Sequence, residues 1–244
     1  MNRRLPVTLV GGFLGAGKTS LLHHFISEHR GGYLAVLVEN PGALNLDAKA
    51  LRGLCGAMRR AQDAVFEIPN GDEAAQIEAI ASCLRDLAAA GRYEHVLIEV
   101  AGTSSPAWLA EHFLAGGACH AWGDLQEIIC VVDALQYQRC GSGPDQAWRE
   151  FQNEQIAGAT LVVLNKCDLL DPNVCRRGCA QKSVLGRARG ARRTSVSCIA
   201  LISDPLGLVC RGSGRCRRDD ASLRAQCGAR AIRRTARSWS GSCR

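Results

Sequence analysis

Short apolar runs alternate with segments of helical periodicity over the first 171 of the 244 residues. The runs are nearly continuous, as expected for strands that are buried on both faces of a sheet. They lie at Leu5–Val10, Tyr33–Val38, Val65–Ile68, His95–Glu99, Ile128–Val132 and Leu161–Leu164. This alternation predicts an α/β fold with a mostly parallel sheet, right-handed crossovers and helices on both faces. Such folds bind their ligands at the carboxyl ends of the strands.

Two of the intervening segments have recognisable helix boundaries. Asn70 followed by Glu73 resembles a capping box that opens a helix, and Gly91 ends it. A second helix is predicted over Asp145–Ile156. The residues expected to face the core are Ile77, Ile80, Leu84 and Leu87 in the first helix, and Trp148, Phe151 and Gln155 in the second.

Residues 12–19, Gly-Phe-Leu-Gly-Ala-Gly-Lys-Thr, fit the pattern G-x-x-x-x-G-K-[ST] at every fixed position. A strand precedes them and an amphipathic helix follows, which is the context that a phosphate-binding loop (P-loop) requires. In such a loop, backbone amides surround the phosphate oxygens, Lys18 reaches the terminal phosphates and Thr19 holds Mg²⁺. The alternative is a chance match, against which both flanks argue. The predicted phosphate-binding residues are Gly12, Gly15, Ala16, Gly17, Lys18, Thr19 and Ser20.

Two further segments follow strands whose carboxyl ends should lie beside this loop. Glu99 ends one strand and Gly102 follows three residues later, so the acid can hold Mg²⁺ and the glycine amide can meet a γ-phosphate. The alternative is an ordinary strand end with an exposed glutamate. Residues 39–47 lie where a nucleotide-sensing switch would be, and an ordinary connecting loop explains them equally well.

The strand Leu161–Leu164 runs into Asn165-Lys166-Cys167-Asp168, which has the pattern N-K-x-D. The Asp168 carboxylate can accept hydrogen bonds from both N1 and N2 of guanine, a donor pair that adenine lacks. Asn165 can bond the base edge and the neighbouring loop, and the Lys166 stem can lie along the ring. A polar connecting loop is the alternative. The motif predicts selection of GTP over ATP.

With these motifs, residues 1–171 resemble the CobW-type GTPases, a subgroup of P-loop GTPases proposed to act as metallochaperones or activators of metal enzymes. The resemblance rests on residues 11–22, on Glu99-Val100-Ala101-Gly102 with Pro106, on residues 131–134, and on Gln155 with residues 164–169. It implies a P-loop fold, binding of GTP and Mg²⁺, and slow GTP hydrolysis. It further implies transfer of a metal such as zinc or cobalt to a client metalloprotein.

The sequence departs from the family pattern at two places. The family has N-G-C-x-C-C with thiolate metal ligands, whereas residues 70–75 here are Asn-Gly-Asp-Glu-Ala-Ala. Asp72 and Glu73 can bind a hard ion weakly, but metal transfer through those thiolates does not follow from this sequence. The first switch, N-E-F-G-E in the family, is Glu39-Asn40-Pro41-Gly42-Ala43, so no catalytic residue is assigned there.

Residues 172–244 differ in composition from the P-loop domain predicted at 1–171. They contain 17 Lys and Arg against 3 Asp and Glu, whereas residues 1–171 contain 13 against 20. They show no extended periodicity, and Trp239 is their only aromatic residue, so a nucleic-acid surface is not favoured. We interpret them as a basic, irregular tail that is translated out of frame, which reading the DNA in its other two frames past codon 171 tests. A disordered basic extension is the alternative.

The remaining features of the sequence predict the compartment in which the protein is found. No stretch of 18 apolar residues exists, so no membrane span is predicted. The six cysteines before residue 172 are scattered and read as buried residues of a reducing compartment, which predicts a cytoplasmic protein. The sequence thus predicts a GTP-binding protein with slow GTP hydrolysis. The alternatives are a non-hydrolysing nucleotide-dependent interaction module and a defective, truncated member of the family.

Overall fold

The computed structural model describes residues 3–29, 32–39, 64–69, 71–139, 146–170 and 195–198. The chain divides into two compact units. The first consists of Met1–Leu14 and Lys18–Ile129, and the second of Gly15–Gly17 and Cys130–Arg244. All of the predicted switch segment at 39–47 except Glu39 lies outside the described residues, as do most of residues 172–244.

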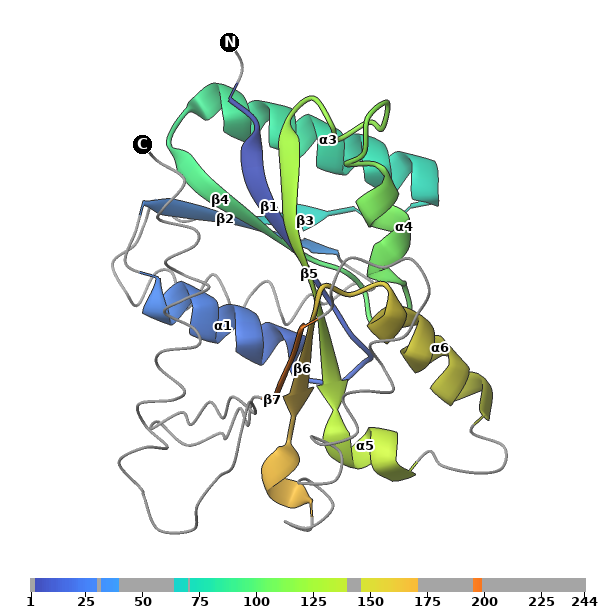
Figure 1. The fold of residues 1–244 in the computed structure, drawn as a ribbon. Coiled ribbons are helices and arrows are strands. Elements are labelled where there is room, and N and C mark those ends of the chain that lie inside the picture. Colours follow the sequence, from blue (N-terminus) through green and yellow to red (C-terminus); the bar gives the residue numbers. More distant parts are fainter. Residues whose placement is uncertain are drawn as a thin grey trace. The chain divides into compact units, whose positions relative to one another are not determined.

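The first unit is built on parallel strands, as the apolar runs predict (Figure 1). Its strands are β1 (Leu5–Gly11), β2 (Tyr33–Glu39), β3 (Ala64–Ile68), β4 (Tyr93–Glu99) and the first part of β5 (Gly123–Asp133), in the order β3-β2-β4-β1-β5. Val10 is the register partner of Glu99, and Val38 is also a partner of Glu99. The carboxyl ends of β1, β2 and β4 therefore lie together.

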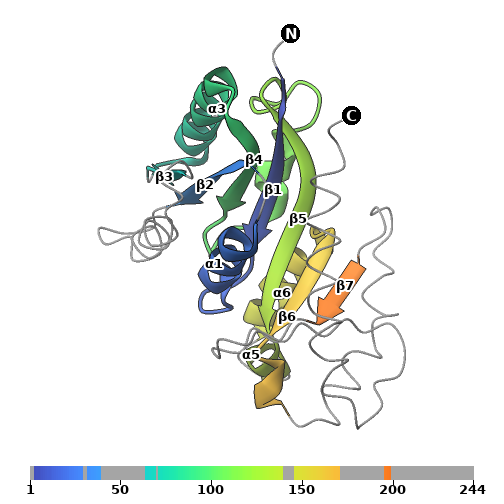
Figure 2. The same cartoon turned by 90° about the vertical axis from the view of Figure 1, so that its left-hand side faces the viewer.

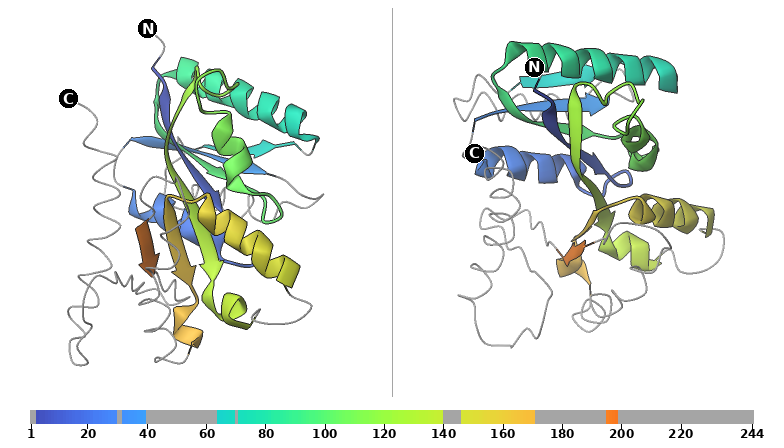
Figure 3. Two further views of the ribbon diagram at one scale, coloured as in Figure 1. Left: turned by 45° about the vertical axis from the view of Figure 1, so that its right-hand side comes forward. Right: turned by 45° about the horizontal axis from the view of Figure 1, so that its top comes forward.

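Helices cover both faces of these strands. They are α1 (Lys18–Glu28), α3 (Glu73–Ala90) and α4 (Pro106–Glu111). One core contains alternate strand residues such as Leu9 and Ile98 packed with Leu84 of α3 and Leu109 of α4. The apolar face of α1, Leu21, Leu22, Phe25 and Ile26, is buried as predicted. Figure 3 shows α1 and α3 on opposite sides of the strands.

The ends of α3 follow from local chemistry. Asp72 is the N-cap: it has extended backbone, and its Oδ1 accepts the Ala75 N–H at 2.8 Å. The capping box predicted at Asn70 is thus wrong, because the cap lies two residues later in the chain. Gly91 ends the helix with φ 67°, a left-handed conformation that favours glycine. Ile80, Leu84 and Leu87 are buried as predicted, whereas Ile77 is half-buried.

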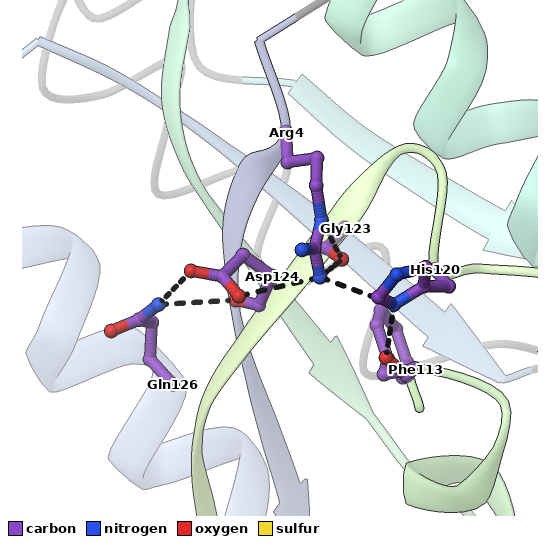
Figure 4. A network of polar contacts seen from close by, with 6 residues as sticks. All are labelled: Arg4, Phe113, His120, Gly123, Asp124 and Gln126. Atoms are coloured by element: carbon purple, nitrogen blue, oxygen red, sulfur yellow. Dashed lines mark hydrogen bonds and ion pairs between the residues drawn. The ribbon is translucent and has the colours of Figure 1, made fainter. Parts of the chain in front are cut away.

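A polar network connects the amino ends of β1 and β5 in the first unit (Figure 4). The Arg4 guanidinium donates to the Gly123 carbonyl from Nε at 3.2 Å and from Nη2 at 2.9 Å. Nη2 also pairs with Asp124 Oδ1 at 3.3 Å and lies 3.5 Å from His120 Nδ1. This network joins the start of the chain to the loop before β5.

The second unit also contains parallel strands (Figure 2). Its elements are the rest of β5, α5 (Ala134–Arg139), α6 (Gln146–Ala157), β6 (Leu161–Asn165), the 3₁₀ helix η1 (Cys167–Leu169) and β7 (Ser195–Cys198). The strand order is β5-β6-β7, and β6 pairs with β7 in parallel. Helix α6 buries Gln152, Gln155 and Ile156, while Trp148 and Phe151 are only half-buried. The prediction is therefore confirmed for Gln155 but not for Trp148 and Phe151.

The predicted α/β class is confirmed, since parallel strands alternate with helices in both units. The domain boundary at residue 171 stays a prediction, and β7 is the described part of the chain beyond it. Among the described residues, no helix is both long enough and apolar enough to cross a membrane.

Candidate functional site

Both ends of the P-loop belong to the first unit. Residues 12–14 follow β1, which ends at Gly11, and α1 begins at Lys18. Lys18 is buried, and its ammonium donates to the Gly12 carbonyl at 3.0 Å. A buried ammonium beside the backbone of a glycine-rich loop has the chemistry to hold an anion, because burial strengthens charge interactions. Ser20, another predicted binding residue, is exposed on α1.

Thr19 and Glu99 meet beside this loop. The Thr19 hydroxyl donates to Glu99 Oε1 at 3.4 Å, and the Glu99 side chain is buried. The pairing of β1 with β4 brings them together, because Val10 and Glu99 are register partners at the ends of their strands. A hydroxyl and a carboxylate are hard oxygen ligands of the kind that Mg²⁺ prefers. The residues therefore fit the predicted magnesium ion.

The segment after Glu99 is locked against the loop and strand β1. The Val100 N–H donates to the Val10 carbonyl at 2.9 Å. A Cβ on Gly102 would lie 2.7 Å from the Leu14 nitrogen, and a Cβ on Gly11 would lie 2.8 Å from Pro106 Cγ. Side chains at these two glycines would push backbone or ring atoms apart. Glycine at positions 11 and 102 thus has a steric reason in addition to any binding role.

Glu39 is a buried carboxylate that the sequence did not single out as a site residue. It ends β2, is 6% exposed, and accepts the Ala101 N–H through Oε2 at 2.7 Å. Its Oε1 has no hydrogen-bond partner among the described residues. Burial raises the pKa of the Glu39 carboxyl, against the opposing effects of the Ala101 N–H and the Lys18 ammonium. An acid that ends a strand next to β4 was the signal in the sequence.

The centre of the P-loop belongs to the second unit, together with the N-K-x-D motif. Asn165 ends β6, is buried, and donates from Nδ2 to the Ala16 carbonyl at 2.8 Å. Gly17 has φ 101°, and a Cβ there would overlap the Asn165 amide. The predicted contact of Asn165 with a neighbouring loop is therefore present. This close approach explains why position 17 is a glycine and why position 165 carries a side-chain amide.

Lys166 follows Asn165 in the left-handed region, with φ 59° and ψ 30°. Its N–H donates to Asn165 Oδ1 at 2.8 Å, and its ammonium pairs with Asp133 Oδ2 at 2.6 Å. Asp168 lies in η1, directly after this turn. Its predicted contact with guanine stays a prediction, as do the binding roles of the P-loop residues.

Residues 6–186 match the model of the family described as CobW/HypB/UreG, nucleotide-binding domain. The chain belongs to this family. It is 32% identical over 201 residues to the zinc chaperone CobW of Pseudomonas aeruginosa, which covers 71% of this chain and 52% of that protein. It is 30% identical over 193 residues to the zinc-regulated GTPase metalloprotein activator 1 of Dictyostelium discoideum, covering 68% of this chain and 41% of that protein.

Among solved structures, the Zn(II)-bound YjiA GTPase from E. coli superposes with a TM-score of 0.54 at 19% identity, covering 83% of this chain and 59% of that one. This similarity supports the fold alone. The chain spans about half the length of the curated relatives CobW and YjiA that it matches. The predicted membership in the CobW group is confirmed.

The resemblance leads one to expect cysteines at positions 72, 74 and 75, which are Asp, Ala and Ala here. Asp72 uses Oδ1 to cap α3, and Glu73, at the variable position of the motif, is exposed in the first turn of that helix. Among the described residues, no group of three or more His, Cys, Asp or Glu side chains is arranged to hold a metal ion. A carboxylate is a harder ligand than a thiolate, and Oδ1 of Asp72 is already engaged in the cap, so Asp72 is a poor replacement for a cysteine ligand.

Proposed function

We propose that this chain binds GTP together with Mg²⁺ and hydrolyses GTP slowly. Lys18 and the amides around Gly15 and Gly17 would hold the phosphates, and Thr19 with Glu99 would hold the magnesium ion. Asn165, Lys166 and Asp168 would select guanine. The observation that carries the proposal is the Thr19–Glu99 contact at 3.4 Å beside the buried Lys18, which gathers a cation and oxygen ligands at the end of β1. Membership in the CobW family supports it.

The first test is a titration of the full chain with a fluorescent GTP analogue, with and without Mg²⁺. We expect binding that Mg²⁺ strengthens, that GDP competes away, and that excess ATP leaves intact. Absence of binding by a folded protein, or equal competition by ATP, would contradict the proposal.

Two matched variants test the magnesium ligands. Thr19→Val keeps the shape of the side chain but removes the hydroxyl, so Mg²⁺ should no longer strengthen binding. Thr19→Ser restores a hydroxyl and should recover most of the magnesium effect. If both variants respond to Mg²⁺ like the wild type, Thr19 does not hold the ion.

The proposed partner of the nucleotide-bound form is a client metalloprotein, by analogy with relatives named zinc chaperone and metalloprotein activator. Metal transfer through a C-x-C-C motif is not part of the proposal, because residues 72–75 are Asp, Glu, Ala and Ala, and Asp72 caps a helix. The altered first switch, Glu-Asn-Pro-Gly-Ala at residues 39–43 in place of N-E-F-G-E, favours a second candidate, a nucleotide-dependent interaction module that does not hydrolyse GTP. A single-turnover assay separates the two, since cleavage of bound GTP would remove the second candidate.

A further inference from the structure

Asp133, the last residue of β5, uses its two carboxylate oxygens for two different contacts within the second unit. Oδ1 accepts the Gln136 N–H at 3.0 Å in the first turn of α5. Oδ2 pairs with the Lys166 ammonium at 2.6 Å. The Asp133 side chain is 10% exposed and that of Lys166 is 36% exposed. The pair is thus partly shielded from water, where a charge-assisted hydrogen bond is stronger than at an open surface.

Lys166 needs such support because of its backbone. Among the described residues it is the one non-glycine residue with a positive φ, at 59°. A side chain with a Cβ is disfavoured in this region, and the conformation persists when the surrounding structure fixes it. Three contacts do so here. They are the bond from the Lys166 N–H to Asn165 Oδ1, the bond from the Leu169 N–H to the Lys166 carbonyl, and the ion pair with Asp133.

The consequence extends to both residues on either side of Lys166. Asn165 precedes it and donates to the Ala16 carbonyl, while η1, which contains Asp168, begins directly after it. The orientation of the peptide at Lys166 therefore sets the direction in which the N-K-x-D chain continues. The Asp133 carboxylate, 33 residues earlier in the chain, helps to fix that orientation by holding the Lys166 ammonium.

We propose that Asp133 is a positioning residue for guanine recognition, which acts by holding Lys166 through the ion pair at the end of β5. This inference rests on the proposed function, and it adds a residue outside the N-K-x-D motif to the base-selecting apparatus. Asp133 itself need not touch the nucleotide. It keeps the Lys166 stem in place beside the expected position of the base.

The alternative is that Asp133 matters only as the cap of α5. The variant Asp133→Asn separates the two contacts, because the Asn side-chain oxygen can still accept the Gln136 N–H while the charge opposite Lys166 is lost. Asp133→Ala removes both contacts and serves as the comparison for the cap. A purely structural role predicts that Asn behaves like the wild type and that Ala lowers the thermal stability without changing base preference.

The test measures dissociation constants of GTP and ATP for the full chain by competition with a fluorescent GTP analogue. For Asp133→Asn we expect GTP affinity to fall about tenfold, with little change in ATP affinity, so that the preference for GTP narrows by about the same factor. The melting temperature should stay close to that of the wild type. Unchanged GTP affinity and preference in Asp133→Asn would overturn the inference.

A double-mutant cycle with Lys166→Met shows whether the effect passes through the ion pair. Met keeps most of the apolar stem and lacks the ammonium. If Asp133 acts through Lys166, the double variant should lose no more GTP preference than the more affected single variant. Independent, additive losses would overturn the inference.

The wild type provides the control for the underlying function. A folded wild-type chain that binds no guanine nucleotide overturns the proposed function and this inference together. A wild-type chain that prefers GTP, with an Asp133→Asn variant that prefers it equally, overturns the inference alone.

Discussion

The carboxyl and amino ends of the same strands in the first unit carry polar groups of different kinds. At the carboxyl ends, Lys18, Glu39 and Glu99 are all at most 8% exposed. At the amino ends, Arg4 and Asp124 form an ion pair whose side chains are 37% and 51% exposed. Burying charge is costly unless it serves a purpose, whereas an exposed pair costs little and contributes little. The contrast supports the proposed binding role of the carboxyl ends, whereas the exposed pair at the amino ends connects parts of the fold.

The largest expected effect that tests this contrast is on nucleotide binding. Lys18→Ala removes the buried ammonium at the carboxyl ends, and we expect GTP affinity to fall by roughly 100-fold, equivalent to about 3 kcal/mol. The matched control is Arg85→Ala, which removes an exposed cation on α3. Fluorescent-nucleotide titration of both variants measures the difference. Equal affinities in the two variants would contradict the role of the carboxyl ends.

This part of the site was predictable from the sequence because it is local in the chain. Strand, glycine loop and helix follow one another within residues 5–28, and the fixed residues of the motif carry the chemistry. The same holds for the run from β6 into Asn165 and Lys166. Each motif includes the residues that shape it, so its pattern survives in a single sequence.

The supporting contacts could not be predicted because they are distant in the chain. Glu39 meets Ala101 across 62 residues, and Asp133 meets Lys166 across 33. Both acids lie in segments that the sequence analysis used, residues 39–43 and 131–134, but those segments do not reveal the partners, which depend on strand order and, for Glu39, on a backbone N–H. The short helices α4 and α5 were missed because six residues span fewer than two helical turns, too few for an apolar pattern to repeat clearly.

The second prediction concerns His95, a residue that is buried away from the carboxyl ends of the strands. His95 is as buried as Glu99, but it lies nearer the amino end of β4 and shares a hydrogen bond with the Thr8 hydroxyl, Nε2 to Oγ1 at 2.9 Å. Burial, aided by the charge of His29, lowers the pKa of His95 from 6.5 to about 3. The unfolded chain therefore binds a proton at this residue between pH 6.5 and 3 that the folded chain does not.

Stability should consequently fall as the pH is lowered through 6.5. At pH 5 the contribution of His95 to this loss is about 2 kcal/mol relative to pH 7.5. His95→Gln cannot take up this proton, so its free energy of unfolding should change less between the two pH values by about that amount. Urea unfolding of the wild type and the variant at both pH values measures how much the free energy of unfolding changes with pH in each protein, whatever the variant's absolute stability. Equal changes in the free energy of unfolding of the two proteins would show that the buried histidine does not resist protonation.

Glu39 gives an expected effect of opposite sign and smaller size. Its pKa is raised in the folded chain, mainly by burial, so the folded chain holds its proton to higher pH than the unfolded chain. Stability contributed by the neutral form is lost as the pH rises from the unfolded pKa through the folded one. Glu39→Gln keeps an acceptor for the Ala101 N–H without the charge, and we expect it to gain about 1 kcal/mol of stability at pH 8. Thermal unfolding at pH 8 and pH 5 checks this. A variant less stable than the wild type at pH 8 would mean that the carboxylate stabilises the carboxyl end by itself.

The smallest expected effect lies at the amino ends. Asp124→Asn removes the charge that faces Arg4, and because both side chains are more than a third exposed, the loss of stability should stay below about 0.5 kcal/mol. Arg4→Met also removes both hydrogen bonds to the Gly123 carbonyl, so its loss should be larger, at about 1 kcal/mol. Neither variant should change GTP affinity, because neither residue lies at the carboxyl ends of the strands. Chemical unfolding and nucleotide titration of the same two proteins provide both values. A change in GTP affinity in either variant without a matching loss of stability would show that the two ends of the strands are coupled rather than separate in purpose.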